Sequence, residues 1–199
     1  YITLLLGMQP NCHEYKVMGL APYAKGAMAD EVYQIFRRHM YVDGIDFKYY
    51  TRPEDLYYWF KDRLEGYRFD AIAGGLQKYT EEILLQYTQN AMNHFNAKRL
   101  VYSGGVSMNV KVNMHLKDLE EVQDMFVCGS GGDGSLAMGA CFVYLDQMGE
   151  LDIDPLTHTY LGPTPTSEEI EKTLSKAKAD GYEIKPADKN VVSDLLMEG

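Results

Sequence analysis

A pattern that occurs twice in succession constrains the fold of this chain most strongly. Each copy has a short apolar run, a glycine-rich turn and a segment of helical character. The strand, loop and helix of the two copies are predicted at residues 100–103, 104–105 and 107–116, and at residues 122–128, 129–134 and 135–148. Two such units predict an α/β sheet. Adjacent parallel strands would bring both glycine loops to one edge, where ligands usually bind.

The remaining segments predict a mostly helical surrounding for this sheet. Apolar spacing and turn residues predict helices at 15–23, 30–40 and 70–95, a hairpin at 42–50 turning at Asp43 and Gly44, and a short helix starting at Pro53. Asp70 is placed to cap the long helix. The proline-containing stretch 152–167 predicts a linker, followed by a capped helix from Ser167, a strand at Tyr182–Lys185 and the start of another helix.

Composition narrows the class of protein. The chain has 199 residues, a net charge of -10 and a pI near 4.9, which disfavours nucleic acid as the main partner. No apolar run approaches the roughly 18 to 20 residues that would span a bilayer, so we expect no membrane segment. The three cysteines show no CxxC spacing, which favours reduced thiols and a cytoplasmic protein. Because the chain opens on Tyr1 without a methionine, we expect it to be a segment of a longer polypeptide.

Both glycine loops have a functional and a plain interpretation. In the first, SGGVSMN (103–109), glycine amides at a helix start could contact a phosphate or an adenosine, or could form only a tight turn. In the second, GSGGDGSLAMG (129–139), Asp133 could hold a metal ion or cap the following helix. Their expected proximity supports a ligand site more than either loop does alone.

Other motifs are less specific. In EYKVMGLAPY (14–23), Lys16 could face a phosphate, but the apolar spacing by itself favours a packed helix. The sequence contains neither an HxxxH pair nor a GxSxG motif, which argues against a helical two-histidine metal clamp and against a serine hydrolase.

Four segments together carry a family resemblance. In this order, the chain contains EYKVMGLAPY at 14–23, AGGLQKYTE at 73–81, SGGVSMN at 103–109 and DGSLAMGA at 133–140. The chain thereby resembles the O-carbamoyltransferases of nodulation-factor and antibiotic biosynthesis and, more distantly, the tRNA threonylcarbamoyltransferases. The resemblance implies half of an actin-like, sugar-kinase-like ATPase fold of the ribonuclease-H type. Residues 1–152 would be the C-terminal half of the carbamoyl-transfer domain, and residues 153–199 a linker and the start of an α+β domain that activates carbamoyl phosphate.

The resemblance also implies site residues and cofactors. Gly104, Gly105 and Asn109 would contact the nucleotide, Lys16 would lie near it, and Asp133 would bind a divalent metal ion, with iron expected. The complete enzyme would use ATP and carbamoyl phosphate to form carbamoyl-adenylate, and would transfer the carbamoyl group to a hydroxyl of a small-molecule or glycoside acceptor. No catalytic residue is identified.

Two features of the family are missing from this sequence: the HxxxH pair of the metal site and the arginine-bearing motifs of the activating domain. The resemblance therefore implies that the remainder of the same polypeptide is the chain's partner, and that the chain alone is inactive. Whether the chain forms a homodimer is left open. Two other functions also fit the pattern of glycine loops: a non-catalytic nucleotide-binding or scaffolding module, and a sugar-kinase-like phosphotransferase.

Overall fold

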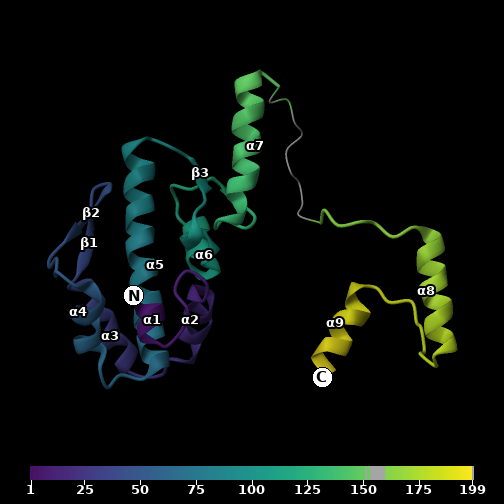
Figure 1. Cartoon of the computed structure of the whole chain (residues 1–199), viewed down its shortest axis with the longest axis horizontal. Helices are drawn as coiled ribbons and strands as arrows, with labels where there is room; N and C mark the ends of the chain where they lie inside the picture. The colour runs from purple at the N-terminus through teal and green to yellow at the C-terminus, as the bar shows by residue number, and fades with distance from the viewer. Residues whose placement is uncertain (151, 153–159, 199) are drawn as a thin grey trace. The chain divides into compact units, whose positions relative to one another are not determined.

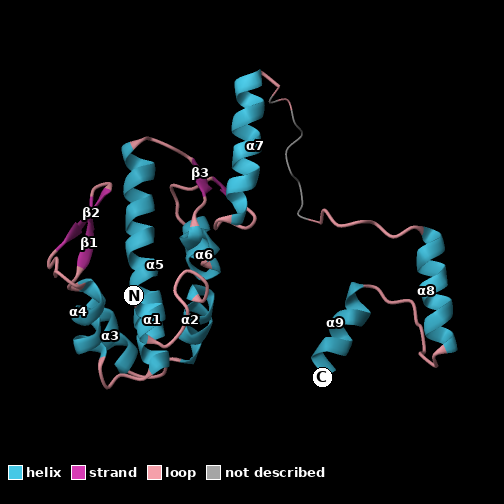
Figure 2. Ribbon diagram, in the orientation of Figure 1, coloured by secondary structure: helices cyan, strands magenta, loops and turns pink. Residues whose placement is uncertain are grey.

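The computed structural model describes residues 1–150, 152 and 160–198, and the chain divides into two units, Tyr1–Asp152 and Ile153–Gly199. Figure 1 shows the course of the chain and Figure 2 its helices and strands. None of the described helices is long and apolar enough to cross a membrane. The predicted linker lies partly outside the described residues, and the roles predicted for the two domains stay predictions.

The first unit is built around one long helix, α5 (Phe69–His94). The other elements of its first hundred residues are α1 (Ile2–Leu5), α2 (Glu14–Leu20), the 3-10 helix η1 (Ala21–Tyr23), α3 (Met28–Arg37), strands β1 (Met40–Asp43) and β2 (Asp46–Tyr49), and α4 (Leu56–Leu64). Figure 1 shows the hairpin on one side of α5 and α6 on the other. This central position of α5 explains why its buried residues occur all along its length.

Two glycines allow the helices to approach α5 closely. A Cβ atom at Gly75 would lie 2.8 Å from the backbone nitrogen of Tyr33 on α3, and one at Gly74 would lie 2.5 Å from the Cβ of Ala24. Beside this contact Phe36 is buried, with its ring 5.2 Å from that of Phe60 and 5.8 Å from that of Tyr79, measured between centroids. Aromatic packing of this kind contributes to the stability of the core.

Some predicted boundaries are wrong. The hairpin turns at Gly44 and Ile45 and not at Asp43 and Gly44, because Asp43 pairs with Asp46 across the antiparallel strands. Gly44 has a φ of 63°, which glycine adopts without strain. Asp70 does not cap α5, which begins one residue earlier, with Arg68 at the N-cap position. The carboxylate of Asp70 instead accepts two hydrogen bonds from the guanidinium of Arg68, both 3.0 Å long.

The doubled strand, loop and helix unit is confirmed, as is the coarse α/β assignment. Strands β3 (Arg99–Tyr102) and β4 (Asp124–Val127) pair in parallel, with Val101 opposite Phe126. The predicted helix 107–116 is divided into the 3-10 helix η2 (Gly105–Met108) and α6 (Val110–Lys117). The division falls at Asn109, because its side chain leaves the helical pattern to cap α6.

Helix α7 (Gly134–Met148) follows β4 and the second glycine loop. It is apolar, as predicted, yet none of its residues is buried. Among its side chains, Leu136 is 69% exposed and Tyr144 is 62% exposed. Figure 1 shows α7 standing clear of α5. The helix is therefore specified by its own sequence and not by packing within the described residues.

The second unit contains helices α8 (Ser167–Ala179) and α9 (Lys189–Glu198). The predicted cap of the first is confirmed as a capping box: the Thr166 hydroxyl accepts from the backbone of Glu169, and the Glu169 carboxylate accepts from the backbone of Thr166. The strand predicted at Tyr182–Lys185 is wrong, since these residues are irregular. No strand is described between residues 160 and 198, so this segment has no neighbour to pair with.

Candidate nucleotide pocket between two glycine loops

A pocket of about 540 Å³ lies where the two glycine loops meet α2 and α5. Its lining residues are Thr3, Asn11, Glu14, Tyr15, Val17, Met18, Ala73, Leu76, Gln77, Thr80, Gly105, Val106, Met108, Asn109, Gly132 and Asp133. We call it the glycine-loop pocket. It brings together three of the five predicted site residues, Gly105, Asn109 and Asp133. Its size is within the range of small-molecule sites.

The two loops are fastened directly to one another. The backbone N–H of Gly104 donates a 2.8 Å hydrogen bond to the carbonyl oxygen of Gly131. Gly131 is buried, and a Cβ atom there would lie only 2.0 Å from the hydroxyl oxygen of Ser107. Gly104 has a φ of 97°, a backbone conformation that other residues avoid. Glycine is thus required at both positions for the loops to pack.

Two backbone amides at the start of η2 are not used in the fold. The N–H groups of Gly105 and Val106 have no hydrogen-bond partner among the described residues, and both residues line the pocket. The N–H of Gly104 is already bonded to Gly131, so Gly104 shapes the loop. Its contact with a nucleotide stays a prediction. The pocket therefore offers two free amide donors to an acceptor group of a ligand.

Asn109 connects the first loop to α5. Its Oδ1 atom accepts from the backbone N–H of Val112 at 3.2 Å, which caps α6. Its side chain also forms two hydrogen bonds with Gln77, of 2.9 Å and 3.1 Å. Gln77 in turn donates to the Oε1 atom of Glu81 at 2.9 Å. The predicted ligand residue thus also has a structural function in this position.

Glu14 gives the pocket a carboxylate. Burial tends to raise its pKa, but the opposing hydrogen bonds from the backbone N–H of Asn11 (2.8 Å) and the hydroxyl of Thr3 (3.2 Å) hold that pKa below the ordinary value. Glu14 is therefore ionised at neutral pH. It can accept hydrogen bonds from ligand hydroxyl or amino groups.

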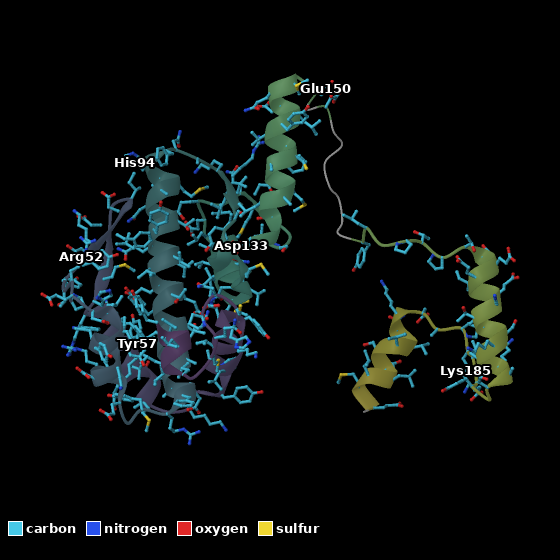
Figure 3. The ribbon with its side chains drawn as sticks, in the orientation of Figure 1. Arg52, Tyr57, His94, Asp133, Glu150 and Lys185 are labelled. Atoms are coloured by element: carbon cyan, nitrogen blue, oxygen red, sulfur yellow. The ribbon has the colours of Figure 1, made fainter. Side chains whose placement is uncertain are left out.

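Asp133 occupies the N-cap position of α7, but its side chain makes no capping hydrogen bond. Figure 3 shows it at the end of α7 nearest to the α6 region. The exposed carboxylate has no hydrogen bond or ion pair with any described residue. The capping alternative does not describe this structure, whereas the metal-ligand prediction stays open.

Lys16 is not among the residues that line the pocket. Its Nζ atom lies 3.1 Å from Nε2 of His13 and 5.8 Å from the ring centre of Tyr15. Among the described lining residues, the only charged side chains are the carboxylates of Glu14 and Asp133. The pocket as described is therefore acidic, and the predicted role of Lys16 is untested.

The residues described do not contain a cluster of three or more histidine, cysteine, aspartate or glutamate side chains that could hold a metal ion. Asp133 could supply one ligand of a metal ion but not a complete site. Sequence reasoning missed Glu14 and Gln77 as pocket residues. Both lie in the segments 14–23 and 73–81 that carry the resemblance, which was the available signal.

Comparison with known proteins identifies the family. The model of the carbamoyltransferase N-terminus matches residues 1–142. The chain belongs to this family. Among curated proteins it is 26% identical over 188 residues to the uncharacterized protein MJ1058 of Methanocaldococcus jannaschii, covering 88% of this chain and 30% of the relative. It is 28% identical over 157 residues to the nodulation protein NolNO of Sinorhizobium fredii, covering 75% and 23%.

A shorter match connects the chain to a second group of proteins. Over 55 residues it is 40% identical to a tRNA N6-adenosine threonylcarbamoyltransferase of Persephonella marina, covering 28% of this chain and 16% of the relative. The predicted family relationship is thus confirmed. The chain spans 30% and 38% of the length of two archaeal relatives that it matches.

Proposed function

We propose that this chain is the second part of the carbamoyl-transfer domain of an O-carbamoyltransferase. The observation that carries the proposal is the match of the carbamoyltransferase N-terminus family over residues 1–142, which include every residue of the glycine-loop pocket. Two parallel strands with joined glycine loops suit half of an actin-like ATPase domain. The remainder of the same polypeptide would supply the other half and the domain that activates carbamoyl phosphate.

In this proposal, the pocket binds the nucleotide part of carbamoyl-adenylate, which is formed from ATP and carbamoyl phosphate. The free N–H groups of Gly105 and Val106 donate to phosphate oxygens. The ionised carboxylate of Glu14 accepts from hydroxyl groups of the ligand. An acceptor hydroxyl then attacks the carbamoyl carbon and gives its proton to a base, the bond from that carbon to the phosphate oxygen breaks, and AMP leaves.

The positioning of the nucleotide is the main contribution of this chain. The two loops are bonded to each other, so their amides are held in place before the ligand arrives. Preorganised donors of this kind stabilise developing negative charge without a cost of reorientation during the reaction. The small-molecule acceptor and the catalytic base would contact parts of the enzyme outside these loops.

We also propose that Asp133 supplies one ligand to a divalent metal ion, expected to be iron, in the complete enzyme. Its free carboxylate at the rim of the pocket supports this, but the described residues do not complete a metal site. A bound divalent cation would polarise the carbamoyl oxygen.

A transfer assay tests the proposed function. The full-length protein is incubated with ATP, radiolabelled carbamoyl phosphate, ferrous iron and a panel of hydroxylated acceptors, and products are separated by chromatography. We expect a carbamoylated acceptor from the full-length protein and none from the 199-residue chain alone. A phosphorylated acceptor would instead indicate a sugar kinase, and the absence of any product would favour a binding or scaffolding module.

The metal assignment is tested by Asp133→Asn in the full-length protein. Because Asp133 makes no capping bond, the Tm of the metal-free form should stay nearly unchanged. Bound iron, measured by elemental analysis, should fall together with transfer activity, since a neutral amide is a weaker ligand than a carboxylate. Asp146→Asn, a substitution in the last turn of α7, is the control. Iron content that stays at the wild-type level in Asp133→Asn would remove Asp133 from the site.

A further inference from the structure

The side-chain amides of Gln77 and Asn109, two residues that line the glycine-loop pocket, are hydrogen-bonded to each other. The two amides form a reciprocal pair: Nε2 of Gln77 donates to Oδ1 of Asn109 at 3.1 Å, and Nδ2 of Asn109 donates to Oε1 of Gln77 at 2.9 Å. Both residues are half-buried and both line the pocket. A side-chain amide has two donor hydrogens and one oxygen that can accept two hydrogen bonds. The remaining capacity of the pair can therefore be counted.

One edge of the pair is fully used. Beyond the pair itself, Nε2 of Gln77 donates to Oε1 of Glu81 at 2.9 Å, and Oδ1 of Asn109 accepts from the backbone N–H of Val112 at 3.2 Å. These two partners also fix the orientation of both amides. Of the two ends of a side-chain amide, a carboxylate can accept only from the nitrogen, and a backbone N–H can donate only to the oxygen.

The opposite edge is free. It consists of Nδ2 of Asn109, with one hydrogen left to donate, and Oε1 of Gln77, with one position left to accept. Neither atom has a further partner among the residues that the structure describes. The two atoms are 2.9 Å apart, so they present a donor and an acceptor side by side. We call this the free amide edge.

We propose that the free amide edge binds a ligand group that carries a hydrogen-bond acceptor beside an amino donor. The carbamoyl group has this chemistry: its carbonyl oxygen would accept from Asn109, and its amino group would donate to Gln77. The amino edge of adenine has the same chemistry, with a ring nitrogen as acceptor. This inference rests on the proposed function, because it assumes that the pocket binds carbamoyl-adenylate or its precursors.

In this arrangement Glu81 is a positioning residue. It lies outside the pocket lining and acts by keeping the nitrogen of Gln77 turned away from the free edge. His115 lies behind it, with Nε2 3.6 Å from the Oε2 atom of Glu81. The order of contacts from α6 to the pocket is thus His115, Glu81, Gln77 and Asn109.

The test compares ligands that differ only in the amino donor. Carbamoyl phosphate is compared with acetyl phosphate, in which a methyl group replaces the amino group, and ADP with purine riboside 5′-diphosphate, which lacks the 6-amino group. Binding to the full-length protein is measured by titration calorimetry. We expect the amino-bearing member of one pair to bind at least tenfold more tightly, and the pair that shows the preference identifies which of the two groups the edge recognises.

Two variants connect the preference to the edge. Gln77→Leu removes the acceptor, and the tenfold preference should fall to about onefold. Asn109→Asp keeps the cap of α6, because Asp caps about as well as Asn, but it replaces the free donor with an oxygen. Both members of a pair carry the acceptor group that this donor binds, so this variant should weaken the binding of both by at least tenfold. It serves where Gln77→Leu fails to fold. Gln89→Leu is the matched control, since Gln89 is also on α5 and donates to a glutamate, Glu121, at 2.9 Å, but lies outside the pocket lining; it should keep the preference.

The outcomes separate the two proposals. Three results would overturn recognition by the free amide edge and leave the proposed nucleotide pocket standing: measurable binding with equal affinity within both pairs, a preference that persists in Gln77→Leu, or unchanged binding in Asn109→Asp. If none of the four ligands binds to the folded full-length protein, the proposed function of the pocket and the edge both fail.

Discussion

Helices α5 and α7 are both rich in apolar residues, but only α5 is packed within the described part of the chain. Seven residues of α5 are buried, among them Gly75 and Tyr79, whereas α7 has none. The two helices differ in what packs against them. Gly74 and Gly75 let the neighbouring helical segments approach the backbone of α5, and nothing comparable covers α7 in residues 1–150. Apolar composition predicts a helix in both cases, but burial depends on what packs against it.

A pair of alanine substitutions, one on each side of this comparison, should give the largest difference in stability. Phe36→Ala removes a fully buried ring between Phe60 and Tyr79 and should lower the free energy of unfolding by about 3–5 kcal/mol. Leu136→Ala on α7 should change it by less than about 0.5 kcal/mol, since that side chain is largely exposed. Urea denaturation of the 199-residue chain measures both. Equal losses would show that α7 is packed after all.

A substitution at Gly131, in the loop that precedes α7, should have the next largest effect on stability. Gly131→Ala places a Cβ atom against the hydroxyl of Ser107 and should destabilise the chain by about 1–3 kcal/mol. Ser107→Ala removes that hydroxyl, so the double variant should recover most of the loss. Thermal unfolding of the four proteins of this double-mutant cycle measures the coupling. Additive effects would mean that the two loops do not touch.

The stability of the packed part of the chain should also depend on pH, because His39 is buried there. Burial lowers the pKa of His39, which contacts the rings of Tyr49 and Trp59. Because the pKa of His39 is lower in the folded than in the unfolded state, the unfolded state binds a proton more readily, and protonation favours unfolding. Stability is therefore complete above about pH 6.5, the ordinary value for histidine, and is lost as the pH falls, by at most about 1.4 kcal/mol per pH unit.

Urea denaturation between pH 7.5 and pH 5.5 measures this dependence. The variant His39→Phe keeps an aromatic ring without a titrating group, and its stability should change less across the same range. The same slope in both proteins would mean that other groups cause the dependence.

The sequence predicted features that arise locally. The doubled unit follows from residue patterns over a few turns of chain, and the cap of α8 follows from the spacing of Thr166 and Glu169. Boundaries that depend on competing side-chain contacts were missed, as at Asp70, which is bonded by Arg68. The strand predicted at Tyr182–Lys185 failed because an apolar pattern cannot supply a pairing partner.

The site could be predicted only in part for the same reason. The glycines and Asp133 stand out in the sequence because two glycine loops each follow a predicted strand and precede a predicted helix. The bonds between Gln77 and Asn109 join residues 32 positions apart, and those between Thr3 and Glu14 depend on how α1 meets α2. Contacts of this kind are fixed by tertiary packing, which single-sequence patterns do not contain.

The most direct measurement of the central claim is ATP binding by Gly105→Val in the full-length protein. A Cβ atom at Gly105 would meet no other atom within 4 Å, and its φ is not in the left-handed region, so a side chain fits the fold at this residue of the pocket lining. Gly139→Val on α7, also free of close contacts but outside the pocket lining, is the control. Titration calorimetry should give a loss of affinity of at least tenfold, about 1.4 kcal/mol, for Gly105→Val and little change for the control. Unchanged affinity in Gly105→Val would contradict the assignment of this pocket to the nucleotide.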